Sequence, residues 1–160
     1  MSQTKFVSYG NNGFWAYDVA LGVFLRHLID AAVTRGLNPA WLNDAVEHWR
    51  IIAFVDPYGL TLDESWPAEK IDVLVELIDQ TCDLLSRRDS IPSDEVESWE
   101  GPDDLRLYAR GEAAVPTNHV TSLGHAIRNL ILGTLPAPPP GTDWCYGSQS
   151  TPLTIGRRES

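Results

Sequence analysis

The chain has 160 residues, of which 43% are hydrophobic, with six tryptophans and a formal net charge of −10. This length suits one domain that buries its own core, and this apolar content excludes a wholly disordered chain. The acidic balance also argues against direct binding of DNA or RNA, because contacts with phosphates need a basic face.

No segment is typical of secretion or of a membrane span. Residues 1–12 are polar and lack the basic and apolar regions of a signal peptide. The longest apolar stretch, residues 14–25, is interrupted by Asp18 and followed by Arg26, so it is too short and too polar to cross a bilayer. We therefore expect a cytoplasmic protein that does not bind membranes.

Hydrophobic periodicity predicts helices along most of the chain. The first, over residues 14–35, is apolar around nearly its whole girth and is expected at the centre of the domain. The second begins with Asn38 as its N-cap and Pro39 in its first position, and a turn follows at residues 56–59. A third helix is expected from near Ser65 to about Arg88.

The rest of the chain predicts shorter elements and a tail. Residues 89–104 are expected to form a loop with one turn after Ser93, residues 105–114 a short helix, and residues 117–134 the last helix. The proline-rich segment 136–141 ends that helix, and the residues beyond it could pack as an extended arm or a short strand. The sequence thus predicts an all-α single domain of about five helices, with a helical part at residues 1–135 and a Pro/Gly-rich C-terminal arm at 136–160.

Negative charge is concentrated in residues 56–104, which hold fifteen acidic and three basic residues. The predicted third helix places a row of acidic side chains opposite its buried face. This acidic stripe consists of Glu69, Asp72, Glu76, Asp79 and Asp83. Like charges on successive turns weaken an isolated helix, and the arginines of a partner would offset that loss on binding.

The segment after this helix extends the acidic surface. It includes, among other acids, Asp94, Glu95 and Glu97. Trp66 and Trp99 also lie within the acidic segment, where an aromatic side chain flanked by charge can anchor an interface. The sequence therefore predicts a surface for a basic protein, such as an enzyme that acts on nucleic acids or nucleotides.

Three side chains raise the alternative of a pocket. Asp44 and His48 are four residues apart on the second helix, which suits half of a metal site, an acid/base pair or a simple surface hydrogen bond. Asp18 follows the loop at residues 10–13 and either lines a small pocket with it or favours the dipole of the first helical turn.

The sequence lacks the motifs of catalysis and cofactor binding. Cys82 and Cys145 are expected to be buried or idle thiols, and neither belongs to a CxxC or Cys/His metal box. No phosphate-binding loop and no nucleophile signature occurs. We therefore predict no catalytic residue, no metal and no cofactor.

The acidic stripe, the acidic loop at residues 94–104 and the two tryptophans together resemble, in general character, the immunity proteins of bacterial toxin systems. Those proteins are small, cytoplasmic, acidic and often helical, and they neutralise a cognate toxin by covering its active site or an adjacent surface. The resemblance implies a non-catalytic inhibitor that acts by protein–protein interaction. The alternatives are a small helical enzyme or ligand-binding protein with a pocket near Asp18, Asp44 and His48, and an assembly adaptor that docks through its proline-rich tail.

Overall fold

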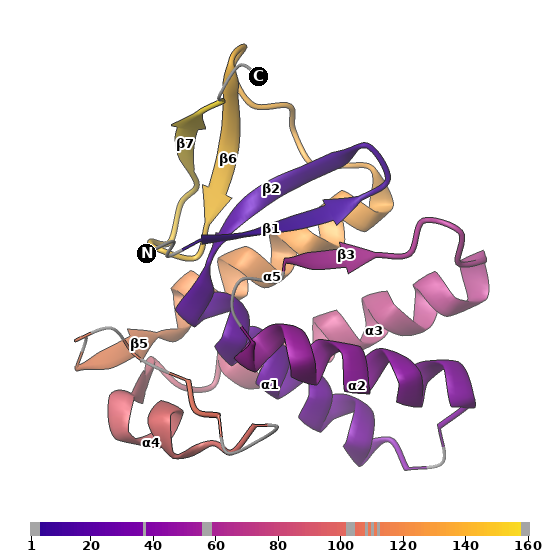
Figure 1. Cartoon of the computed structure of the whole chain (residues 1–160), viewed down its shortest axis with the longest axis vertical. Coiled ribbons are helices and arrows are strands. Elements are labelled where there is room, and N and C mark those ends of the chain that lie inside the picture. The colour runs from indigo at the N-terminus through magenta and orange to yellow at the C-terminus, as the bar shows by residue number, and fades with distance from the viewer. Residues whose placement is uncertain are drawn as a thin grey trace.

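The computed structural model describes residues 4–36, 38–55, 59–101, 105–107, 109, 111 and 113–157. It is an α/β structure with a five-stranded mixed sheet, a second sheet of two strands, and helices packed against them. The prediction of an all-α domain is therefore wrong. Figure 1 shows the large sheet in the upper part of the molecule, with α1 (Asp18–Thr34), α2 (Ala40–Phe54) and α3 (Ala68–Leu85) below it.

An N-terminal hairpin replaces the first turns of the expected first helix. β1 (Thr4–Tyr9) and β2 (Asn12–Tyr17) pair in antiparallel fashion across a two-residue loop. Gly10 in this loop has φ +61°, as tight hairpin turns require. Side chains alternate between the two faces of these strands. Val7 and Phe14 are fully buried on one face, whereas the rings of Phe6 and Trp15 meet edge to face at 5.0 Å on the other.

The C-terminal residues complete the large sheet and do not form a projecting arm. β6 (Thr142–Tyr146) pairs in parallel with β2, and β7 (Leu153–Gly156) pairs with β6 as an edge strand. At the other edge, β3 (Leu60–Leu62) lies parallel to β1, so the strand order is β3-β1-β2-β6-β7. The tail thus takes the short-strand alternative, because β2 offers it a free edge (Figure 1).

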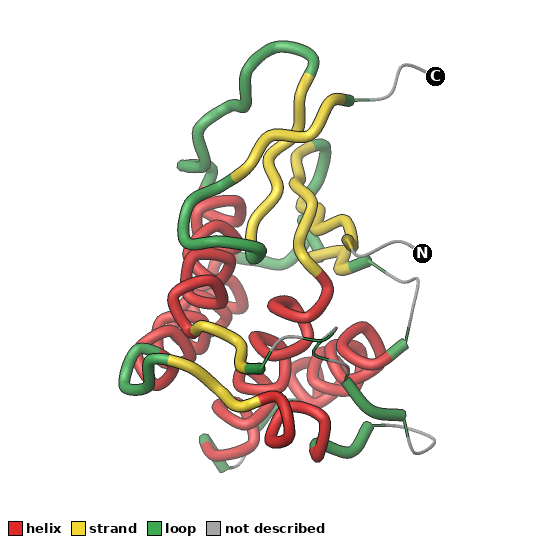
Figure 2. The backbone as a smooth tube through the Cα atoms, turned by 90° about the vertical axis from the view of Figure 1, so that its left-hand side faces the viewer, coloured by secondary structure: helices red, strands yellow, loops and turns green. Residues whose placement is uncertain are grey.

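The expected central helix is confirmed in position, although it is shorter at its start. α1 contacts α2, α3 and α5 (Thr117–Leu132), and its residues 19–25 are all buried. Figure 2 shows the strands of the large sheet gathered at one end, with the helices packed below and beside them. A Cβ at Gly124 of α5 would lie 2.6 Å from the ring of Phe24 and 2.7 Å from Sγ of Cys82, so glycine permits the close approach of α5 to α1 and α3.

A small sheet and a short helix occupy the segment between α3 and α5. β4 (Ser90–Pro92) pairs with β5 (Ala114–Pro116), and α4 (Ser93–Ser98) follows β4. The helix predicted over residues 105–114 is wrong, since none of the described residues of this range is helical. Its buried side chains, Leu107 and Ala109, are two residues apart, which is strand-like rather than helical spacing.

Some expectations fall outside the described residues or change in detail. The predicted turn at residues 56–59 lies outside them except for Gly59, as do the acidic residues 103 and 104. Asn38 does not cap α2: its Nδ2 donates a 2.6 Å hydrogen bond to the carbonyl oxygen of Ala32 near the end of α1, and Pro39 precedes α2. Within the described ranges, no helix is both long and apolar enough for a bilayer crossing.

Candidate functional site

The acidic stripe lies on the exposed side of α3, as its periodicity predicts. The opposite side of the helix packs in the core through Leu74, Ile78 and Leu85, each at most 2% exposed. All five predicted carboxylates of the stripe are exposed. The helix therefore presents them on a rigid support, because its apolar side is held by the core.

Arginines from the same chain neutralise the C-terminal half of the stripe. Nε of Arg128 on α5 lies 2.8 Å from the carboxylate of Asp79, and Nη2 of Arg87 lies 3.0 Å from that of Asp83. The first pair joins two helices that the sequence did not place side by side. Arginines of this chain, and not those of a partner, therefore offset the charge of this half.

The N-terminal half of the stripe keeps its charge. Glu69, Asp72 and Glu76 are exposed, and within the described part of the chain none has a hydrogen bond or an ion pair from its carboxylate. Their spacing of three and four residues places them on neighbouring positions of one helix face. We call these three residues the acidic patch.

The predicted residues that follow α3 serve mainly structural contacts. Arg88 binds both carboxylate oxygens of Glu95, at 2.8 and 2.9 Å, and these hydrogen bonds hold the pKa of Glu95 below its ordinary value. Trp99 is half-buried, with its ring 5.5 Å from that of His27 and 5.4 Å from Cζ of Arg26, both on α1. Trp99 thus anchors the segment after α4 to the central helix.

Asp94 and Glu97 remain exposed on α4, which follows the C-terminal end of α3. The carboxylate of Asp94 accepts a 3.0 Å hydrogen bond from the backbone N–H of Glu95. The acidic patch begins near the opposite end of α3, and eighteen residues of helix span roughly 27 Å. Figure 1 shows α4 at one end of α3 and the start of α3 at the other, so the acidic patch lies at the far end of α3 from Asp94 and Glu97.

Trp66 lines a cavity of about 300 Å³ next to the acidic patch. We call it the tryptophan pocket. Its walls come from α2, from β3 and from the loop between β3 and α3. The lining residues are Trp41, Asp44, Ala45, His48, Trp49, Thr61, Leu62, Asp63 and Trp66. The rings of Trp41 and Trp66 meet edge to face at 5.1 Å, and Trp49 is only 2% exposed.

Charged groups surround these rings. Nζ of Lys70 lies 5.3 Å from the ring centre of Trp41 and 5.7 Å from that of Trp66. Oδ1 of Asp63 accepts hydrogen bonds from the backbone N–H and the hydroxyl of Ser65, at 2.9 and 2.5 Å. These bonds, with a smaller contribution from Lys70, lower the pKa of Asp63.

The structure brings two of the three residues of the alternative pocket together. Asp44 and His48 both line the tryptophan pocket, but no hydrogen bond joins these two described side chains. Asp18 begins α1 and does not line this pocket. Among the described residues, no group of three or more His, Cys, Asp or Glu side chains is placed to hold a metal ion.

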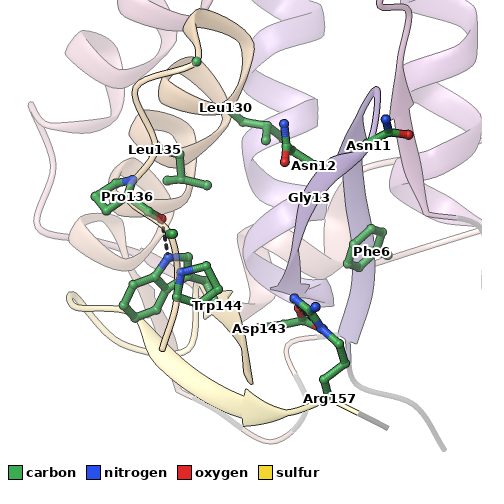
Figure 3. Close-up of a pocket in the computed structure, with 13 residues that line it drawn as sticks. Phe6, Asn11, Asn12, Gly13, Leu130, Leu135, Pro136, Asp143, Trp144 and Arg157 are labelled. Atoms are coloured by element: carbon green, nitrogen blue, oxygen red, sulfur yellow. Dashed lines mark hydrogen bonds and ion pairs between the residues drawn. The ribbon is translucent and has the colours of Figure 1, made fainter. Parts of the chain in front are cut away.

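A second cavity, of about 420 Å³, lies between the tip of the β1–β2 hairpin, the end of α5, the proline-rich segment and β6 (Figure 3). Asn11, Asn12 and Gly13 line it, so the loop at residues 10–13 does border a pocket, although Asp18 is not among the lining residues. The acid there is Asp143.

The two described charged residues that line this second cavity, Asp143 and Arg157, are already paired with each other. The carboxylate of Asp143 accepts hydrogen bonds from Nε and Nη2 of Arg157, at 3.0 and 2.7 Å, and from Nε1 of Trp15 at 3.4 Å. Nε1 of Trp144 donates to the carbonyl oxygen of Pro136 at 2.8 Å (Figure 3). The bond from Trp15 holds β6 to the hairpin, and the others hold β6 to the end of the chain and to the proline-rich segment, so their role is structural.

Sequence reasoning missed Asp63, Ser65 and Lys70, which lie beside Trp66 around the start of α3. Asp63 and Ser65 form a side-chain turn two residues before Pro67, a combination typical of the start of a helix. Lys70 follows Trp66 by four residues, which brings the two side chains to the same side of the helix start. Both signals were present in the sequence, but the sequence did not show that this loop meets the side of α2 that carries Asp44 and His48.

Comparisons of this chain with protein-family models, with curated proteins and with solved structures found no match. Its function is therefore inferred from the residues themselves. The acidic patch and the tryptophan pocket adjoin each other, since Trp66, Glu69 and Lys70 fall within five consecutive residues.

Proposed function

We propose that this chain is a non-catalytic binding protein that attaches to a basic protein through the acidic patch, in the manner of an immunity protein that neutralises a bacterial toxin. The observation that carries the proposal is the exposure of Glu69, Asp72 and Glu76 without an internal cation in the described chain. Elsewhere on the same helix, Asp79 and Asp83 have arginine partners. The chain thus leaves three carboxylates, side by side on one helix, without a cation partner among the described residues.

Uncompensated charge suits recognition of a basic partner. Repulsion between neighbouring carboxylates weakens the free helix by a few tenths of a kcal/mol per close pair, and arginines of a partner would remove it on binding. A concentrated negative field also speeds the encounter with a basic surface. A toxin that acts on nucleic acids or nucleotides has such a surface, because its active site binds phosphates.

Charge reversal at the patch tests the proposal. The variant E69K/D72K/E76K should fold normally, because these side chains lie outside the core. The control D30K/E47K/D89K makes the same change in net charge on other exposed acids, at the loss of two surface ion pairs worth at most about 1 kcal/mol each. Circular dichroism and thermal melting would establish that both variants are folded.

The candidate partner for this test is any basic toxin domain found to be encoded next to the gene of this chain. We expect wild-type protein to bind this domain and to protect cells that express it. The patch variant should bind at least about tenfold more weakly and protect poorly, since attractive pairings become repulsive. The control variant should bind much better than the patch variant. If the patch variant bound the partner with wild-type affinity, the patch would be excluded as the interface.

A further inference from the structure

We propose that the tryptophan pocket receives an arginine side chain of the basic partner and so anchors the complex next to the acidic patch. This inference rests on the proposed function and names the group that the partner must supply. In this arrangement the guanidinium plane contacts the rings of Trp41 and Trp66. Its N–H groups donate hydrogen bonds to the carboxylates of Asp44 and Asp63.

The aromatic walls suit a flat cation. Trp41 and Trp66 stand nearly perpendicular, with 69° between their planes, and so form a corner. The face of an indole ring attracts cations more strongly than any other side-chain ring, and a guanidinium can also stack on it. Trp49 belongs to the core, so this wall of the pocket is preformed and loses little entropy on binding.

The charges around the pocket also favour a cation. Among the described residues, its titratable lining groups are Asp44, His48 and Asp63, and no described Lys or Arg lines it. Asp63 uses Oδ1 for Ser65, and no hydrogen bond is recorded for its Oδ2 or for the carboxylate of Asp44 in the described chain. A guanidinium carries five N–H donors in a planar fork, which matches acceptors of this kind.

Lys70 competes with this ligand and so provides a test of it. Its ammonium already lies within 6 Å of the centres of both rings, so this corner holds a cation in the free protein. Lys70 itself does not line the cavity, and it repels any second cation that enters. The proposal therefore predicts that removal of the Lys70 charge strengthens binding of a cation in the pocket.

The position of the pocket links it to the patch. Trp66 precedes α3, and Glu76, the last residue of the patch, is ten residues further along, which is about 15 Å of helix. An arginine placed against the corner of Trp41 and Trp66 would bring adjoining basic residues of the partner over Glu69, Asp72 and Glu76. The hydrophobic anchor and the charged surface would thus act on one partner face.

The probes for this test are N-acetyl-arginine amide and the neutral analogue N-acetyl-citrulline amide, added to the whole chain. The readout is the shift of the indole N–H signals of the six tryptophans in NMR spectra. We expect the arginine probe to shift Trp41 and Trp66 saturably in the millimolar range, while Trp15 and Trp144, which lie outside the pocket, stay unchanged. Equal responses to both probes, or no response at Trp41 and Trp66, would overturn the proposal.

Four variants sharpen the result. D44N and D63N should each lower the affinity for the arginine probe about three- to tenfold. Asn at position 63 can still accept the hydrogen bonds from Ser65. K70M should raise the affinity for this probe severalfold. D72N, outside the pocket, is the matched control and should leave the affinity unchanged. Weaker binding by K70M, or equal loss in D72N and D63N, would contradict a cation site at this position.

Failure of the pocket and failure of the proposed function give different results. In one outcome, the patch variant fails to bind the partner while the arginine probe leaves the NMR signals of Trp41 and Trp66 unchanged. That result contradicts the pocket proposal and supports the proposed function. If the probe binds as expected while the patch variant still binds the partner, the patch is not the interface and the pocket is a cation site.

Discussion

The ammonium group of Lys5, on β1, donates a 2.8 Å hydrogen bond to the carbonyl oxygen of Ile52 near the end of α2. It also donates to the carbonyl oxygen of Val55 at 3.3 Å, and the residue is only 7% exposed. The last carbonyls of a helix have no partners within the helix, so a cation suits this position. Lys5 therefore ties the sheet to α2.

Replacing Lys5 by Met should lower the free energy of unfolding by about 1–3 kcal/mol, because buried carbonyls would lose their donor. Urea denaturation followed by tryptophan fluorescence measures this change. K70M removes a charge from a half-buried site and is the comparison, with a smaller expected loss. A K5M protein as stable as wild type would show that the ammonium contributes nothing net.

The ion pair between Arg88 and Glu95 should make stability depend on pH. The pKa of Glu95 lies below its ordinary value of 4.5 in the folded chain, so the pair stabilises the fold above that value. This contribution is lost as pH falls through the folded pKa. Because the two side chains are 46% and 39% exposed, solvent screening limits it to about 1 kcal/mol.

We therefore expect E95Q to be less stable than wild type at pH 7 by at most about 1 kcal/mol, and this deficit to shrink as the pH is lowered to about 3. Urea unfolding at the two pH values gives the comparison. E97Q changes an exposed neighbour on α4 and should show no such pH-dependent difference. A deficit of E95Q that persists unchanged at pH 3 would point to lost packing instead of lost charge.

The thiol of Cys82 should be unreactive in the folded protein. Burial chiefly, and the nearby charge of Asp79, raise its pKa to about 12, so little thiolate exists at pH 8. Burial also raises the pKa of Cys145. We expect iodoacetamide to modify both cysteines quickly in urea and slowly in the native state, as mass spectrometry would record.

Removal of the Asp79 charge gives an internal control for this prediction. D79N should speed the modification of Cys82, because the charge that raises its pKa is gone while Arg128 remains. Cys145 should react at its previous rate. Rapid labelling of Cys82 in the folded wild-type chain would contradict the assigned burial.

Association with the basic partner should slow as salt is added. The Debye length falls to about 8 Å at physiological ionic strength, so long-range attraction to the acidic patch is screened. Stopped-flow measurements between about 50 and 500 mM salt should show a falling association rate and a nearly constant dissociation rate. An association rate indifferent to salt would exclude steering by this surface.

Local patterns in the sequence were enough to predict the long helices and their buried sides. The central position of α1 followed from its apolar girth, and the exposed acidic side of α3 followed from its period of 3.6 residues. The hairpin was predictable in principle, since Gly10 interrupts alternating residues, but Phe14 and Trp15 also fit the start of a helix. Short apolar runs are ambiguous between the two periods.

Pairings between distant residues were decided only by the tertiary structure. Trp15 pairs with Cys145 in the sheet, and β2 supplied the edge that turned an expected arm into strands. Arg128 reaches Asp79 across 49 residues and divides the acidic stripe into a neutralised half and a charged half. The sequence by itself determined which residues are apolar, aromatic or charged along each helix. Packing determined which of them meet, because the partner of each side chain lies on another element.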